Sequence, residues 1–193
     1  MSDDDKIWFQ DHYILTKKVL TLWNKYYIQD ASGRNLGFCK QKMFKLKEDL
    51  RIYTDENQTT ELFRIKQQQI FDAWGKFAIV DSQSGAHLGY LKRDALKSGF
   101  VKDVWEMYDH NDRLIGKVSE KTWMGLLRKY VSNLIPEKMT LEINGQPIAY
   151  INQRFKIIGD IWDITCLKGA RNIDRRVFLG AALLMGMIER SRK

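Results

Sequence analysis

The chain contains one continuous apolar run, "VFLGAALLMGMI", from Val177 to Ile188. No charged or strongly polar side chain interrupts these 12 residues, which Arg176 precedes and Glu189 follows. A helix that is apolar on every face lies either in a bilayer or inside a large protein core. Because 12 helical residues rise roughly 18 Å and the hydrocarbon core of a bilayer is about 30 Å thick, the run is too short to span a membrane.

We therefore predict a helix buried in protein. Each large apolar side chain contributes roughly 1.5–3 kcal/mol when it is fully removed from water, as an upper estimate. That burial requires a host structure that surrounds the helix. The side chains predicted to be buried are those of Val177, Phe178, Leu179, Leu183, Leu184, Met185, Met187 and Ile188.

Four segments upstream share one pattern: a strand, a turn of Asp, Ser, Asn or Gly, and a returning strand. They read "YYIQDASGRNLGFCKQK", "FAIVDSQSGAHLGYLKRD", "WEMYDHNDRLIGKVSEK" and "LEINGQPIAYINQRFKI". This pattern predicts β-hairpins, and Asn144-Gly145 suits a type I′ turn. A small residue recurs at one offset in the returning strand, namely Gly37, Gly89, Gly116 and Ala149. The repetition predicts a bulge or a close approach of the backbone to a central element.

Apolar and polar residues alternate, as they do in half-buried strands, in stretches between these hairpins such as "KLKEDLRIY", "TELFRIKQ" and "DIWDITCL". About a dozen strands result, a number that suits a closed antiparallel barrel. The exception is "SEKTWMGLLRKYVSNLIP", whose apolar spacing predicts an amphipathic helix that Pro136 ends. A barrel of this size has a lumen too wide for its own side chains, and the apolar helix would fill it. We predict a mainly β fold, an approximately twelve-stranded antiparallel barrel that encloses the C-terminal helix, with residues 1–193 forming a single domain.

The sequence offers little for catalysis. It lacks the phosphate-binding, nucleophile-elbow, zinc-protease and dinucleotide motifs, and His12, His87 and His110 are scattered. No enzyme activity, cofactor or metal site is predicted. Cys39 and Cys166 lie far apart without a CxxC motif, and the acidic start "MSDDDK" is unlike a signal peptide. These features predict free thiols and a cytoplasmic protein, with peripheral attachment to a membrane as a further option.

The order and spacing of these elements resemble the tubby C-terminal-like superfamily, and within it the LURP-one-related group. The resemblance covers about residues 12 to 190, and its clearest parts are the opening "YILTKKVLTLWNKYYIQDASGRNLGFCKQKMFKLKEDLRIYTDE" and the middle "GYLKRDALKSGFVKDVWEMYDHNDRLIGKVSE". It implies a twelve-stranded barrel threaded by the terminal helix. Tubby domains bind phosphoinositide headgroups, and the related scramblases are credited with calcium-dependent lipid translocation. The scramblases' acidic calcium segment corresponds here to the basic "CLKGARNIDRR".

The formal charge of +8 favours polyanionic partners. We predict a binding module for anionic phospholipid or phosphoinositide headgroups, and rank nucleic acid below lipid. Lys40 and Lys42 follow Gly37 as Lys92 and Arg93 follow Gly89, so these four are predicted lipid contacts. A solvated outer strand face is the alternative for any one of them.

Arg175 and Arg176 complete the predicted lipid contacts. They precede an apolar helix whose dipole disfavours cations there, so they need a carboxylate, solvent or a bound phosphate. Two further functional readings stay open, a protein-interaction scaffold of unknown partner and a scramblase-like protein without the calcium segment. We assume a monomer.

Overall fold

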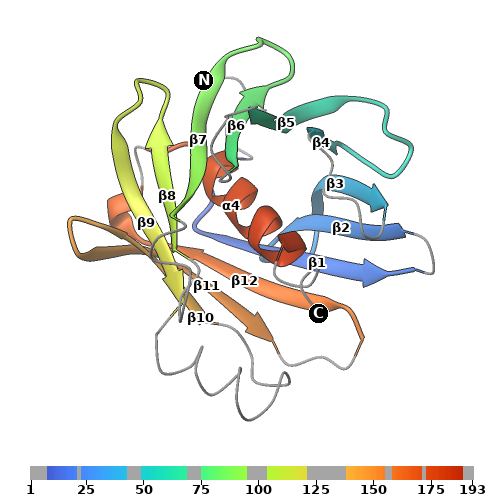
Figure 1. Ribbon diagram of the computed structural model, residues 1–193. Coiled ribbons are helices and arrows are strands. Elements are labelled where there is room, and N and C mark those ends of the chain that lie inside the picture. Colours follow the sequence, from blue (N-terminus) through green and yellow to red (C-terminus); the bar gives the residue numbers. More distant parts are fainter. Residues whose placement is uncertain are drawn as a thin grey trace.

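The computed structural model describes residues 8–20, 23–42, 49–68, 75–94, 104–120, 138–154, 158–170 and 173–188. Strands dominate this part of the chain, and one α-helix, α4 (Arg175–Ile188), lies among them (Figure 1). A short 3-10 helix, η1 (Lys168–Ala170), precedes it. The strands are β1 (His12–Val19), β2 (Trp23–Asp30), β3 (Asn35–Lys42), β4 (Asp49–Tyr53), β5 (Glu61–Gln68), β6 (Lys76–Asp81), β7 (His87–Asp94), β8 (Val104–Asp109), β9 (Leu114–Glu120), β10 (Lys138–Ile143), β11 (Gln146–Arg154) and β12 (Asp160–Cys166).

The twelve strands form a closed barrel in which each strand pairs with its sequence neighbours and β1 pairs with β12. All of these pairings are antiparallel, so the barrel has two distinct ends. We call the end where odd-numbered strands finish the loop end, and the end where even-numbered strands finish the turn end. The predicted barrel is confirmed. The amphipathic helix predicted at residues 119–136 lies outside the described residues, except that Ser119 and Glu120 belong to β9.

The four predicted hairpins share a β-bulge. In each, the register shifts at the end of the first strand, between Ile28/Gln29, Ile79/Val80, Met107/Tyr108 and Leu141/Glu142. The turn then begins with a residue suited to it. Aspartates at the ends of β2, β6 and β8 accept hydrogen bonds from backbone N–H groups two to four residues ahead. Asn144 and Gly145 have φ values of 51° and 77°, as a type I′ turn requires.

The recurring glycines have different neighbours. A Cβ on Gly89, where φ is 153°, would lie 2.4 Å from the carbonyl oxygen of Tyr108 and 3.4 Å from Val177 of α4. A Cβ on Gly116 would lie 2.7 Å from the carbonyl oxygen of Glu142. At Gly37 the nearest atoms belong to side chains. The backbone of a neighbouring strand therefore approaches closely at Gly89 and Gly116, and Gly89 also lies against the helix.

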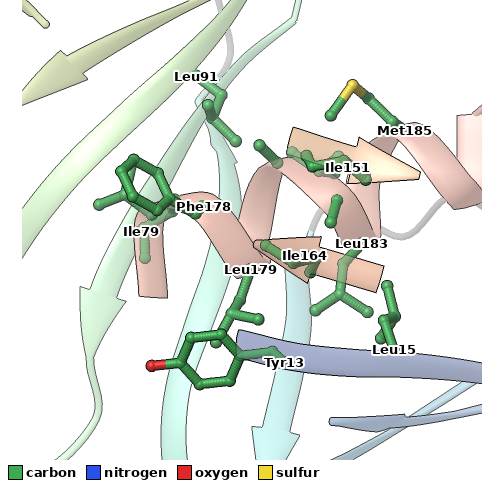
Figure 2. Packing of buried hydrophobic residues seen from close by; sticks show 14 of the residues in the cluster. Tyr13, Leu15, Ile79, Leu91, Ile151, Ile164, Phe178, Leu179, Leu183 and Met185 are labelled. Atoms are coloured by element: carbon green, nitrogen blue, oxygen red, sulfur yellow. The ribbon is translucent and has the colours of Figure 1, made fainter. Parts of the chain in front are cut away.

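Helix α4 occupies the lumen, and its side chains point toward the surrounding strands (Figure 2). Its Gly180 packs against β6, because a Cβ there would meet Ile79 Cδ1 at 2.8 Å. The side chain of Ile188 is outside the described part of the structure. The other large apolar residues of the helix are at most 5% exposed: Val177, Phe178, Leu179, Leu183, Leu184, Met185 and Met187. The helix therefore completes the hydrophobic core of the barrel.

The segment before β1 joins this core at the turn end. The indole of Trp8 is buried and lies edge-on to the ring of Phe63 in β5, with centroids 5.5 Å apart. Gln10 donates its backbone N–H to the hydroxyl of Tyr13 at 3.0 Å. Burial raises the pKa of that Tyr13 hydroxyl well above its ordinary range. The α4 helix falls short of the length needed to cross a bilayer, and no other helix in the described residues reaches it.

Candidate functional site

Three lysines form a row across the outer face of three neighbouring strands. Lys18 of β1 lies opposite Lys25 of β2, and Lys25 lies opposite Lys40 of β3. The adjacent Tyr26 and Cys39 face the core, so alternation directs the lysines outward. Like charges directly opposite one another on a sheet repel. We call Lys18, Lys25 and Lys40 the lysine row.

Aromatic rings support the ammonium groups of the lysine row. The Nζ of Lys18 lies 4.8 Å from the ring centroid of Tyr27, and the Nζ of Lys40 lies 4.7 Å from that of Trp23. A cation above an aromatic face gains about 0.5–1 kcal/mol at exposed sites. These contacts hold the positive charges at the surface while leaving them available to an anion.

The lysines differ in their access to a carboxylate. Lys25 forms a salt bridge with Glu56 from the β4–β5 loop, and the Tyr27 hydroxyl donates to the same carboxylate at 2.6 Å. Hydrogen bonds from Lys25 and then from Tyr27 lower the pKa of Glu56. Within the described residues, neither Lys18 nor Lys40 forms a salt bridge. The row therefore carries more positive than negative charge, since Glu56 pairs with Lys25 and acts on Lys18 from a greater distance.

A polar groove of about 520 Å³ lies beside the lysine row. Strands β1 to β3 form its floor and the β4–β5 loop forms one wall. Hydrogen bonds fix several of its amide and hydroxyl groups, including Thr16 to Gln29 at 3.1 Å. It is lined by Thr16, Lys18, Tyr27, Gln29, Asn35, Asp55, Glu56 and Asn57.

A second pair of opposed lysines lies on the β6–β7 hairpin. Lys76 is opposite Lys92, and Lys92 is in turn opposite Glu106 of β8. The Nζ of Lys76 lies 3.6 Å from the ring centroid of Tyr90, which stacks on Tyr108 at 4.4 Å. The exposed Lys92 follows Gly89 by the same three residues that separate Lys40 from Gly37. The two hairpins therefore present opposed lysines at equivalent positions.

Glu106 partly neutralises this second pair. Its carboxylate accepts a hydrogen bond from the Tyr108 hydroxyl at 2.8 Å and forms a salt bridge with Lys117 at 3.1 Å. Lys76 lies 4.0 Å from Asp112, at the limit of a salt bridge. The lysine row is therefore the more positive of the two places.

The structure places the predicted lipid contacts of the strands on two separate parts of the barrel wall, because β4, β5 and β6 lie between β3 and β7. Lys40 and Lys92 lie on the outer face near the loop end. Lys42 lies opposite Trp23 in the β2–β3 register, and Arg93 lies opposite Trp105 in the β7–β8 register. The side chains of Lys42 and Arg93 are outside the described part of the structure.

Arg175 lies at the turn end and is only 2% exposed. Its guanidinium donates to the carbonyl oxygens of Ala170, of Ile173 at 3.0 Å and of Gln10 at 3.3 Å. It also lies 5.7 Å from the ring centroid of Phe178. Arg175 therefore ties η1 and the segment before β1 to the helix, and its charge is satisfied by backbone carbonyls.

Arg176 is held by two carboxylates. It contacts both oxygens of Asp174, with Nη2 to Oδ2 at 2.6 Å, and forms a salt bridge with Asp81 at the end of β6. Asp174 also caps the helix, because its carboxylate accepts the backbone N–H of Arg176 at 2.9 Å. Of the partners considered for Arg176, the structure supplies carboxylates. We leave both arginines out of the candidate surface, since neither lies near the lysine row.

Charge is distributed unevenly along the barrel axis. In the described residues, bases outnumber acids toward the loop end. The bases there are Lys17, Lys18, Lys25, Lys40, Lys42, Lys66, Lys76, Lys92, Arg93, Lys138 and Arg154, and the acids are Asp49, Asp94, Glu106, Glu120 and Asp160. Toward the turn end, acids outnumber bases. The acids there include Asp30, Asp55, Glu56, Glu61, Asp81, Asp109, Asp112 and Asp174, and the bases are Arg34, Arg113, Lys168, Arg175 and Arg176. The candidate surface lies in the half with the excess of bases.

Nothing in the described residues forms an evident catalytic or metal site. No three His, Cys, Asp or Glu side chains gather there as a metal site would need. Burial raises the pKa of the Cys39 thiol to about 12 and that of the Cys166 thiol to about 11. Both thiols are therefore protonated at neutral pH and poorly nucleophilic.

Sequence analysis alone did not identify Lys18, Lys25 and Lys76 as parts of the surface. Lys25 precedes Ile28 by three residues, as Lys76 precedes Ile79, and Ile28 and Ile79 lie opposite Gly37 and Gly89. The equal spacing of Lys25 and Lys76 from these isoleucines could have identified both lysines from the sequence. Lys18 could be found only through the β1–β2 register.

An antiparallel barrel closed around one apolar helix defines the tubby-like class of barrels. The chain belongs to the LURP-one-related family, whose model matches residues 37–180. The fold is also similar to the crystal structure of an Arabidopsis thaliana protein, with a TM-score of 0.54 and 12% sequence identity, over 98% of this chain and 96% of that one. A comparison with curated proteins finds no match.

Proposed function

We propose that this protein is a non-enzymatic binding module that docks onto anionic membrane lipid headgroups. Its family supports a binding role on a tubby-like barrel. The observation that carries the lipid proposal is the lysine row, in which three strands place positive charges opposite one another. Such an arrangement is unfavourable in isolation, and a phosphate lying across it relieves the repulsion.

The expected affinity is moderate and electrostatic. A basic residue near an anionic membrane surface contributes about 1 kcal/mol. Lys18, Lys40, Lys76 and Lys92 together would supply about 4 kcal/mol, or roughly a 1000-fold gain in affinity. Because mobile ions screen these charges, binding should weaken as salt rises.

Vesicle flotation tests the proposal. We expect the protein to bind phosphatidylserine-rich or phosphoinositide-containing vesicles at low salt, to dissociate at high salt, and to ignore neutral phosphatidylcholine vesicles. The double variant Lys40→Glu/Lys92→Glu should lower the affinity roughly 100-fold or more, since each reversal replaces an attraction by a repulsion.

The matched control is Arg113→Glu/Lys168→Glu. These two exposed residues lie at the turn end, and their reversal changes the net charge by the same amount. Binding should be nearly unaffected in this control. Equal losses of vesicle affinity in both double variants would show that only net charge matters. If the unchanged protein binds no vesicle, the lipid proposal is wrong.

The polar groove beside the lysine row favours a second candidate function, a protein-interaction scaffold. Its carboxylates and amides suit a polypeptide better than they suit a phosphate. On this reading, the protein would not float with vesicles, and Tyr27→Ala in the groove would abolish capture of a partner from cells. Lipid translocation is a third reading, and a dithionite assay on vesicles with fluorescent lipid would detect it.

A further inference from the structure

Exposed apolar side chains gather at one corner of the loop end. Among the described residues, the large exposed hydrophobic side chains are those of Phe9, Val19, Leu20, Leu114 and Ile158. Phe9 and Leu114 lie at the turn end. Val19, Leu20 and Ile158, which we call the apolar tip, are 36%, 45% and 72% exposed and lie at the loop end.

The barrel closure brings the apolar tip together. Lys17 of β1 lies opposite Asp160 of β12. Val19 is two residues beyond Lys17, and Ile158 is two residues before Asp160, so both strands lead to the same corner. Leu20 follows Val19 and donates its backbone N–H to the carbonyl oxygen of Trp23 at 2.9 Å. Two distant parts of the sequence therefore bring three exposed apolar residues to the same corner of the barrel.

The base of the apolar tip is well braced. The Lys17 ammonium lies 3.8 Å from the Asp160 carboxylate, and both side chains are buried. Gln153 of β11 donates to Asp160 at 2.7 Å. Gly159, with a φ of 78°, makes the turn between Ile158 and β12 that only glycine adopts readily. The contacts of Asp160 with Lys17 and Gln153 therefore fix the relative positions of the strands that carry the exposed side chains.

We propose that the apolar tip inserts between the acyl chains of an anionic bilayer while the lysine row contacts the headgroups. This inference rests on the proposed function and adds the orientation of the protein on the membrane, with the loop end facing the bilayer. Lys18 precedes Val19 at the end of β1 and is exposed. Because side chains alternate along a strand, Lys18 points outward from the barrel wall and Val19 points toward the barrel mouth, so a cationic group and an apolar group lie on the two sides of one rim. A bilayer surface offers the matching pair, negative headgroups above hydrocarbon.

A second copy of the chain fits the same corner poorly. A two-fold contact through the apolar tip would bring the same patch of each protomer together. It would therefore bring Lys18 toward its own copy, which repels it. Three side chains also bury far less surface than a stable protein interface needs.

A depth-sensitive fluorophore tests the insertion directly. Cys39 and Cys166 are buried, so an NBD label directed to a new cysteine, Ile158→Cys, should modify that position selectively. On phosphatidylserine-rich vesicles, we expect its emission to rise several-fold and shift to the blue, and lipids spin-labelled on the acyl chain to quench it. The matched control, Leu114→Cys, carries the label at an exposed apolar position of the turn end and should show no change.

An unlabelled variant provides an independent measurement. Leu20→Ser/Ile158→Ser should lower vesicle affinity about 10- to 100-fold, and the remaining binding should be fully reversed by salt. Its circular dichroism and melting temperature should match those of the unchanged protein, because both side chains are exposed.

The outcomes separate this inference from the proposed function. If the unchanged protein does not bind vesicles, both fail. If it binds but the label at position 158 keeps its aqueous emission, only the insertion is contradicted, and headgroup docking stands. A dimer in solution that Ile158→Ser dissociates would assign the apolar tip to a second copy and would also overturn the insertion.

Discussion

The two ends of the barrel use charge in opposite ways. At the turn end, charged groups have partners: Arg176 lies between Asp174 and Asp81, and Arg175 donates to three backbone carbonyls. Toward the loop end, Lys18, Lys25 and Lys40 stand opposite one another, and one carboxylate, that of Glu56 in the β4–β5 loop, pairs with Lys25. Matched charges hold a structure together, whereas like charges left side by side weaken it unless something external binds.

The same hairpin repeat produces both ends. At the turn end, it ends strands with aspartates that order the turns, so Asp30, Asp81 and Asp109 are occupied by their own backbone. At the loop end, it leaves lysines at equivalent places, which no turn requires. The aspartates that end β2, β6 and β8 therefore serve the fold, whereas the lysines of the lysine row are available to a partner.

The largest loss of stability should come from a substitution in α4, the helix that packs against the strands between both ends. Leu183 is fully buried in the lumen, and Leu183→Ala leaves a cavity that rigid strands cannot close. We expect a loss of about 4 kcal/mol in the free energy of unfolding, measured by urea denaturation. Leu114→Ala, at an exposed position, is the control and should cost less than about 0.5 kcal/mol. Similar losses in both variants would contradict a filled barrel.

At the turn end, Arg175→Met should cost about 3 kcal/mol in unfolding free energy. The variant keeps an apolar stem but removes the charged donor shared by Ala170, Ile173 and Gln10. It should also release the segment before β1, which limited proteolysis followed by mass spectrometry would detect. An unaltered stability would show that the buried guanidinium is dispensable and that the turn end is not held as described.

Acid should weaken the turn end. Burial alone would raise the pKa of Asp81, but hydrogen bonds from Ser84 and the charge and hydrogen bond of Arg176 outweigh it, so that the pKa of Asp81 is lowered. A carboxyl whose pKa is lower in the folded state stabilises the fold above its unfolded pKa and loses that effect as the pH falls through the folded value. Asp81→Asn should therefore cost about 1–2 kcal/mol at pH 7 and much less at pH 3.

Urea titrations at both pH values measure this difference. Asp112→Asn, at an exposed position of the turn between β8 and β9, is the control. Its unfolding free energy should differ little from that of the unchanged protein at either pH. A constant cost of Asp81→Asn between pH 7 and pH 3 would show that the charge of Asp81 does not stabilise the fold.

The smallest effect on stability should come from the loop end. Lys40→Met removes one charge from the lysine row and retains a similar stem over Trp23. Because it relieves the repulsion from Lys25, the free energy of unfolding should stay within about 0.5 kcal/mol of the original value or rise slightly. A clear loss would place Lys40 among the structural residues and remove the contrast between the two ends.

Much of this fold follows from local patterns. The hairpin repeat, the bulge near each turn and the all-round apolar helix are visible in short stretches, so the barrel and its filled lumen could be predicted. Lys40 and Lys92 could also be recognised as equivalent positions, because each follows its glycine, Gly37 or Gly89, by three residues.

The rest depends on contacts between distant segments. Lys18 lies opposite Lys25 only because of the register between β1 and β2. A shift of one residue in that register would turn the side chain of Lys18 to the inner face of the barrel. The apolar tip depends on closure between β1 and β12. Arg175 and Arg176 are adjacent in sequence, yet one faces backbone carbonyls and the other reaches Asp81 in β6. No local pattern distinguishes these two destinations.

The position of α4 after β12 has a consequence for synthesis of the protein. The first strand can close the barrel only when the strand that pairs His12 with Thr165 has been made, and the helix that fills the lumen emerges later still. Ribosomes add about 5–20 residues per second, so the apolar inner faces of the early strands wait for several seconds without their partner. The complete core of the barrel therefore forms only after α4 has left the ribosome.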